Sequence, residues 1–197
     1  MQWFEVFARP RRNLVALGSA LMLGLSSAAV AAPLVVDQQA SSVGVTFTQM
    51  NVPVDAQFTR FDAQTEYDPA NPAAATATIT IDTASFDFGP GAEEYNEEVR
   101  KDEWFAADKH PKAVFKASGA TALGDNRLEV PGELTIKGVT QAVTAPVSVS
   151  QEEGRFVFVG EVPIKRLAFG IGAGEWKDTS LVADAVIVKF KIVATQP

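Results

Sequence analysis

Apolar and polar residues alternate with a period of two along most of the chain after residue 40. An early example is residues 43–48, in which every second side chain is apolar. The longest example is residues 182–192, in which apolar positions lie opposite Lys189 and Lys191. Strict alternation is typical of a β-strand with one buried face, because successive side chains point to opposite sides of a strand.

Counting the alternating runs gives eight predicted strands, at residues 43–48, 57–67, 75–82, 113–118, 128–136, 143–149, 156–164 and 182–192. Turn-forming residues separate them at 68–72, 124–126, 137–138 and 153–154. Short connections and half-polar strands favour an antiparallel sheet. Such a sheet fits either an up-and-down barrel or a sandwich; a closed barrel has no exposed edge strands and can enclose one small ligand.

Two segments interrupt the pattern. Pro131 and Gly132 stand inside the fifth predicted strand and predict a bend or a bulge there. Residues 92–107 carry Tyr95, Val99 and Trp104 among many charged side chains, a spacing that predicts a short amphipathic helix or helical turn. Long connections of this kind are often functional.

The N-terminus has the order of a secretory signal peptide. Arg9, Arg11 and Arg12 precede an apolar run at residues 14–25, and small residues follow at 28–32. The alternative is a membrane anchor, but those twelve residues would span only about 18 Å as a helix, against an apolar bilayer core of about 30 Å. We therefore predict a signal peptide at residues 1–31, a mature domain at 33–197, and a periplasmic location.

Composition excludes several classes of function. The net charge of −7 disfavours binding to nucleic acid or to an anionic lipid surface, both of which need clustered Lys and Arg. The chain has no cysteine, so disulfides, thiolate metal sites and a cysteine nucleophile are excluded. With a single histidine, His110, a His-rich metal site is excluded as well. We predict neither a catalytic nor a metal site, and no cofactor other than a bound lipid.

Three features could suggest chemistry, and each has a simpler interpretation. His110 before Pro111 is interpreted as a turn residue that leads into the next strand. The acidic cluster at residues 93–103 lacks the spacing of a calcium loop and is interpreted as a solvated helix face. The glycines at residues 170–174 do not follow a strand and open a helix as a nucleotide-binding loop does, so a loop at the barrel mouth accounts for them.

Several motifs along the mature chain resemble those of the YceI-like family of exported proteins that bind lipids or polyisoprenoids. The most distinctive is residues 132–140, followed by Val143. The others, in chain order, are Asp37 with Ser42, Val43 and Phe47; Phe58 and Phe61; residues 79–82 with Ser85; residues 98–101 with Trp104, Phe105, His110 and Pro111; residues 115–118; and residues 165–172 with Gly174, Glu175, Trp176, Asp178 and Thr179.

The resemblance implies a lipocalin-like eight-stranded antiparallel barrel with one short helical excursion. It also implies an apolar cavity for an isoprenoid, a quinone or another amphiphilic, fatty-acid-like lipid, held for sequestration or transport. An enzyme acting on such a lipid and a stress-linked accessory of a membrane cytochrome are the alternatives. The sequence leaves the oligomeric state open, a dimer included.

The alternation also predicts which side chains line the cavity, since inward positions of a barrel strand face the lumen. Aromatic residues of the connecting segments are added to them. The predicted lining residues are Val45, Phe47, Phe58, Phe61, Ile79, Ile81, Trp104, Phe105, Ala113, Phe115, Ala117, Leu134, Ala145, Val147, Phe169, Trp176, Val186, Val188 and Phe190.

Overall fold

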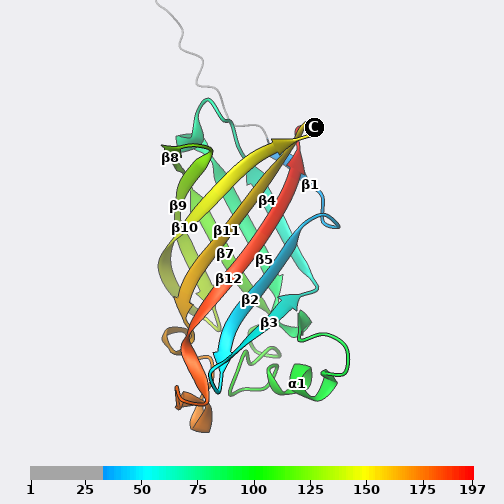
Figure 1. Cartoon of the computed structure of the whole chain (residues 1–197), viewed down its shortest axis with the longest axis vertical. Helices are drawn as coiled ribbons and strands as arrows, with labels where there is room; N and C mark the ends of the chain where they lie inside the picture. Colours follow the sequence, from blue (N-terminus) through cyan, green and yellow to red (C-terminus); the bar gives the residue numbers. More distant parts are fainter. Residues whose placement is uncertain (1–32) are drawn as a thin grey trace, which may run out of the picture.

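The computed structural model describes residues 33–197, so the predicted signal peptide at residues 1–31 lies outside the described part of the chain. The described chain forms a tall barrel of tilted strands with a single short α-helix at one end (Figure 1). The strands are β1 (Pro33–Val36), β2 (Ser42–Gln49), β3 (Val52–Phe58), β4 (Phe61–Glu66), β5 (Thr76–Asp82), β6 (Phe86–Asp87), β7 (Lys112–Ser118), β8 (Thr121–Gly124), β9 (Arg127–Ile136), β10 (Val139–Glu152), β11 (Arg155–Lys165) and β12 (Val182–Thr195).

The barrel wall is a closed ring of eight antiparallel positions, as predicted. β1 and β2 act as one wall position, because both pair with β12, while β1 also pairs with β4 and β2 with β3. β3 and β4 act as a second wall position: β3 pairs with β6, and β4 pairs with β5. From there β5, β7, β9, β10, β11 and β12 pair in chain order, and β8 is a side strand on β9.

Tight hairpin turns connect neighbouring strands. The predicted turns at Lys137 with Gly138 and at Glu153 with Gly154 each have two consecutive residues with positive φ. Two-residue turns of this type match the right-handed twist of the flanking strands, which keeps the register of the pairs unbroken. The ladder between β10 and β11 accordingly runs without interruption from Val147 to Glu152.

Of the bend or bulge predicted at Pro131 and Gly132, the bulge is not found. Both residues lie within β9 and pair in continuous register with β10, Gly132 opposite Val143 and Pro131 opposite Thr144. The glycine has a different reason to be there: a β-carbon at Gly132 would collide with the Lys116 carbonyl and with the ring of Phe115, both on the neighbouring strand β7.

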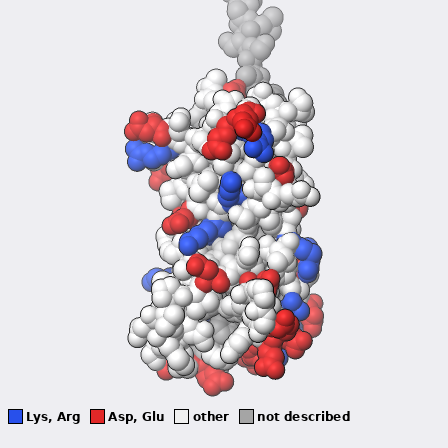
Figure 2. All heavy atoms as spheres, turned by 45° about the vertical axis from the view of Figure 1, so that its right-hand side comes forward, with Lys and Arg blue, Asp and Glu red and all other residues white. Residues whose placement is uncertain are grey.

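The excursion between β6 and β7 is helical only at its start. Helix α1 (Glu93–Glu98) is six residues long, and the chain then continues in turns to Lys109. The Lys101 carbonyl accepts from both Trp104 and Ala106, and Ala106 has φ +49°, a conformation in which a helix cannot continue. The short helix or helical turn predicted within residues 92–107 is thus present, with its α-helical part confined to Glu93–Glu98. Exposed Glu93, Glu94 and Glu97 form the solvated face of α1. Figure 2 shows acidic residues gathered at the lower end of the molecule.

A 3₁₀ turn, η2 (Thr83–Ser85), bends the wall from β5 to β6 and so places Phe86 over the lumen. Asp82 stabilises this bend, because its carboxylate accepts from the Ala84 N–H at 3.0 Å and from Arg60 Nε at 3.0 Å. Desolvation acts to raise the pKa of Asp82. The hydrogen bonds from Arg60 and Ala84, with the charges of Arg60 and Lys112, outweigh it, so the pKa lies below its ordinary value.

We expect Asp82→Ala to lower the free energy of unfolding by about 1 kcal/mol at pH 7, since the turn loses its cap. Because the folded-state pKa is lowered, the stabilisation is present above the unfolded-state pKa of about 3.9 and is lost as the pH falls through the folded-state value. Urea unfolding of both proteins between pH 7 and pH 2.5 measures this. A difference that stays constant over that range would contradict the assignment.

Candidate functional site

The barrel lumen contains two apolar chambers stacked along its axis. The lower chamber lies at the end that carries α1 and has a volume of about 150 Å³. The upper chamber lies towards the end that carries β1 and the C-terminus and has a volume of about 80 Å³. The residues lining one chamber do not line the other. Apolar cavities of about 150 Å³ are large enough to take up a benzene-sized molecule.

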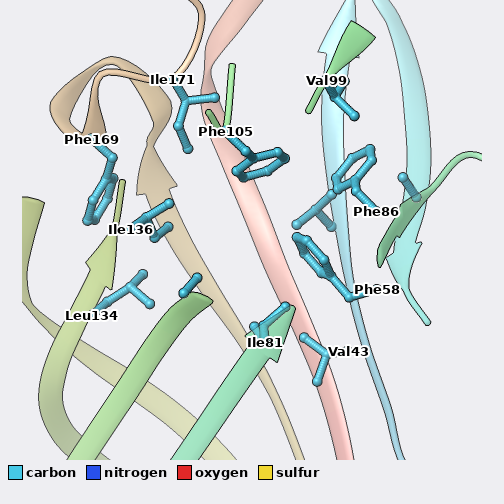
Figure 3. Close-up of a cluster of buried hydrophobic side chains, with 13 residues drawn as sticks. Val43, Phe58, Ile81, Phe86, Val99, Phe105, Leu134, Ile136, Phe169 and Ile171 are labelled. Atoms are coloured by element: carbon cyan, nitrogen blue, oxygen red, sulfur yellow. The ribbon is translucent and has the colours of Figure 1, made fainter. Parts of the chain in front are cut away.

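Aromatic rings dominate the lower chamber. The Phe58 ring lies edge-on to Phe86 at 5.2 Å and to Phe105 at 5.9 Å, measured between ring centroids. Trp104 and Trp176, from the excursion and from the β11–β12 loop, pack at 5.2 Å. Figure 3 shows how these side chains converge: Phe58, Phe86 and Phe105 point into the same interior that the side chains of Leu134 and Ile136 enter from the opposite wall. The chamber is thus an apolar space with many aromatic side chains in its lining.

Arg166 is the buried charge at this end, with only 2% of its surface exposed. Its guanidinium donates to four backbone carbonyls, those of Ala183 (3.1 Å), Ile171 (2.9 Å), Trp176 (2.5 Å) and Val182 (2.7 Å). Burial lowers the pKa of the guanidinium, although the nearby Asp184 opposes the shift. Arg166 therefore holds the β11–β12 loop, with its turns η3 (Arg166–Phe169) and η4 (Gly174–Lys177), against the end of β12.

Lys137 closes the lower end from the opposite side. Its ammonium group, at the β9–β10 turn, donates to the carbonyls of Asp102 at 2.6 Å and Gly170 at 3.0 Å. The Glu103 carbonyl next to it accepts from the N–H groups of Gly172 and Ala173. Three segments that are distant in sequence are joined in this way: the β9–β10 turn, the excursion and the β11–β12 loop.

Alanines are numerous in the lining of the upper chamber, beside larger apolar residues such as Leu128, Phe158 and Ile192. Ala63, Ala75, Ala77, Ala117, Ala120 and Ala145 all line it. Among them, Ala145 is only 1% exposed. Tyr67 stands at its outer end, edge-on to Phe156 and Phe158. Burial raises the pKa of Tyr67, and the charge of Asp68 adds to the shift. The phenol therefore stays neutral at physiological pH.

Seventeen of the nineteen predicted residues line one chamber or the other. Those of the lower chamber are Val45, Phe47, Phe58, Ile81, Trp104, Phe105, Ala113, Leu134, Trp176, Val186 and Val188. Those of the upper chamber are Ile79, Phe115, Ala117, Ala145, Val147 and Phe190. The remaining two line neither: Phe61 packs between the two core clusters, and Phe169 is buried within the lower cluster. Contact of the seventeen with a ligand stays a prediction.

Several lining residues were not among the predicted ones. Ala63, Leu128, Val130, Ile136, Phe158, Ile164, Val182 and Ile192 are strand residues whose burial follows the same alternation. Phe86, Phe88, Tyr95, Val99, Arg166 and Ile171 come from a two-residue strand, the excursion or the β11–β12 loop, where no period marks an inward position. Tyr95 is 66% exposed, so it stands at the mouth of the lower chamber.

His110 lies beside the barrel end rather than at either chamber. It lies two residues before the start of β7, its carbonyl accepts from the Thr83 hydroxyl at 2.8 Å, and its ring packs over Gly138. Within residues 33–197, no group of three or more His, Cys, Asp or Glu side chains is arranged to hold a metal ion. Over the same residues, no helix has the length and apolar character needed to cross a membrane.

Comparison with known proteins gives the family. The model of the YceI-like domain matches residues 34–194, almost the whole described barrel. The chain belongs to the YceI-like family. A UPF0312 protein of Vibrio cholerae is 28% identical over 188 residues, covering 89% of this chain and 98% of the relative. A UPF0312 protein of Vibrio vulnificus is 30% identical and covers 78% of each chain.

Solved structures carry the same barrel as this YceI-like domain. The crystal structure of Burkholderia cenocepacia BcnA superposes with a TM-score of 0.78 at 48% identity, covering 81% of this chain and 99% of that one. A polyisoprenoid-binding domain from Saccharophagus degradans superposes with a TM-score of 0.66 at 18% identity, covering 85% of this chain and 99% of that one. At that low identity the second likeness concerns the fold alone.

Proposed function

We propose that this protein is a periplasmic binding protein that holds an isoprenoid or another amphiphilic lipid in its barrel lumen, for sequestration or transport. The observation that carries the proposal is the pair of apolar chambers inside a closed barrel. Membership of the YceI-like family supports it, as does the shared fold of a domain described as polyisoprenoid-binding. A quinone is one ligand of this class.

The magnitudes are sufficient for binding without any chemistry. Burying one methylene group contributes about 0.8 kcal/mol, so a few isoprene units contribute on the order of 10 kcal/mol. Association and ordering of the chain cost about 4–15 kcal/mol. At the low end of that cost about 6 kcal/mol remains, a dissociation constant on the order of 10⁻⁵ M, and each further isoprene unit that is buried tightens it. The alternative of an enzyme acting on the lipid rests on His110 or on the acidic residues around Trp104. His110 is not among the residues that line the two chambers, whereas Glu98 lines the lower one.

The periplasmic location depends on the N-terminal segment. We expect N-terminal sequencing of the protein from a bacterial periplasm to begin at Ala32 or within a residue or two of it, after cleavage behind Ala31. Protein that keeps Met1 and stays in the membrane fraction would contradict export.

Native mass spectrometry of the protein purified from a periplasm, followed by extraction and identification of the lipid, tests the proposal. We expect a mass excess that organic solvent removes, and an extracted compound with a long apolar tail. Protein that carries no lipid and also takes up none from added geranylgeraniol would overturn it.

A further inference from the structure

Two phenylalanine rings lie directly over glycines of a neighbouring strand. A β-carbon at Gly160 would lie 2.7 Å from Cε1 of Phe190 and closer still to its Cζ. A β-carbon at Gly132 would lie 2.6 Å from Cε2 and 2.7 Å from Cζ of Phe115. Gly160 pairs with Phe190 across β11 and β12, and Gly132 lies on β9 beside β7. Each ring thus fills space that a side chain at the glycine position would need.

Both rings lie at the level where one chamber gives way to the other. Along β12, Val188 lines the lower chamber, whereas Phe190 and Ile192 line the upper one. Along β7, Ala113 lines the lower chamber, whereas Phe115 and Ala117 line the upper one. Phe115 and Phe190 also pack against both core clusters. The two rings therefore lie at the boundary between the two chambers, which a long ligand must cross.

We propose that Phe115 and Phe190 form a gate between the two chambers. Gly132 and Gly160, which have no side chain, leave the space in which the two rings lie, and so a lipid tail can pass. The gate sets the length of the isoprenoid tail that the barrel accepts. The inference rests on the proposed lipid-binding function and specifies its selectivity. A ring seated over a glycine lies against the wall and leaves the axis free. A side chain at the glycine position displaces the ring towards the axis and blocks the tail, because packed interiors hold few voids that could absorb it.

The gate is testable through the ratio of affinities for two prenyl alcohols that differ only in length: geraniol, with two isoprene units, and geranylgeraniol, with four. In the unsubstituted protein we expect geranylgeraniol to bind at least about tenfold more tightly, because its tail gains the second chamber. In Gly160→Ala the displaced Phe190 ring confines the tail to one chamber, and we expect the ratio to fall below about threefold.

The double variant Gly160→Ala with Phe190→Ala separates the gate from strain in the sheet. The new β-carbon would also lie 2.8 Å from the Pro146 carbonyl, a contact that removal of the ring does not relieve. If the glycine acts through the ring, the double variant regains a ratio near that of the unsubstituted protein. Gly132→Ala with Phe115→Ala is the equivalent pair on β9 and β7, where the contact that remains is with the Lys116 carbonyl, 2.6 Å from the new β-carbon.

Phe190→Ala alone keeps the proposal testable if the glycine variants do not fold. Its matched control is Ile192→Ala, the next inward position on β12, which lines the upper chamber without covering a glycine. We expect the ratio to stay or rise in Phe190→Ala and to fall in the control. An unchanged ratio in folded Gly160→Ala, no recovery in the double variant, or equal falls in the two alanine variants would each overturn the gate. If neither alcohol binds the unsubstituted protein, the proposed function itself fails.

Discussion

Replacing Arg166 with methionine is expected to lower the free energy of unfolding by about 3 kcal/mol. Methionine retains much of the buried volume but leaves four carbonyl acceptors at the end of the barrel without their donor. Leaving a buried polar group without its charged partner typically lowers the free energy of unfolding by about 1–3 kcal/mol. Water that reaches the carbonyls in the loosened loop offsets part of the summed loss. Urea unfolding at pH 7 measures the difference.

Lys177→Met is the matched control for this prediction. Lys177 is an exposed cation of the same loop, so we expect its loss to change stability by less than about 0.5 kcal/mol. A loss of less than 1 kcal/mol in Arg166→Met would mean that the guanidinium does not hold the loop.

Ala117→Phe is expected to lower the affinity for geranylgeraniol at least tenfold. Ala117 lines the upper chamber, and a benzyl group at this position occupies space that the lipid tail would otherwise fill. Because that volume is empty without ligand, we expect a small loss of stability. In a tightly packed core the same change would cost about 1–3 kcal/mol. Titration calorimetry and thermal unfolding of the variant beside the unsubstituted protein give both quantities.

Ser118→Phe is the control, because it adds the same ring at the next residue of β7, which faces outwards and is exposed. Affinity should be unchanged there. Unchanged affinity in a folded Ala117→Phe protein would show that the tail does not enter the upper chamber.

The barrel was predictable because strand alternation is a local property. The burial of β7 follows the sequence directly, with Ala113 and Ala117 buried and Lys112 and Lys116 exposed. Splitting of the first two wall positions into β1 with β2 and β3 with β4 was not predicted. The two breaks lie at residues 37–41 and 59–60. At the second break the Arg60 N–H donates to the Ser85 hydroxyl instead of to a backbone carbonyl of a neighbouring strand.

Part of the lower chamber could not be predicted from strand alternation. Phe86 and Ile171 reach it from segments with no regular period, and only the three-dimensional course of the chain brings them there. Phe169, although aromatic and in the same loop as Ile171, packs behind the chamber wall because η3 directs it into the core. Gly132 shows the same limit: the sequence marks it as an interruption, and only the structure reveals the Phe115 ring above it.

The central claim is that the lumen holds the tail of an amphiphilic lipid. A crystal structure of the protein with geranylgeraniol tests it most directly. We predict continuous electron density for the tail from the aromatic lower chamber, past Phe115 and Phe190, into the alanine-lined upper chamber. Density for the alcohol on the outer surface alone, with both chambers empty, would contradict the account.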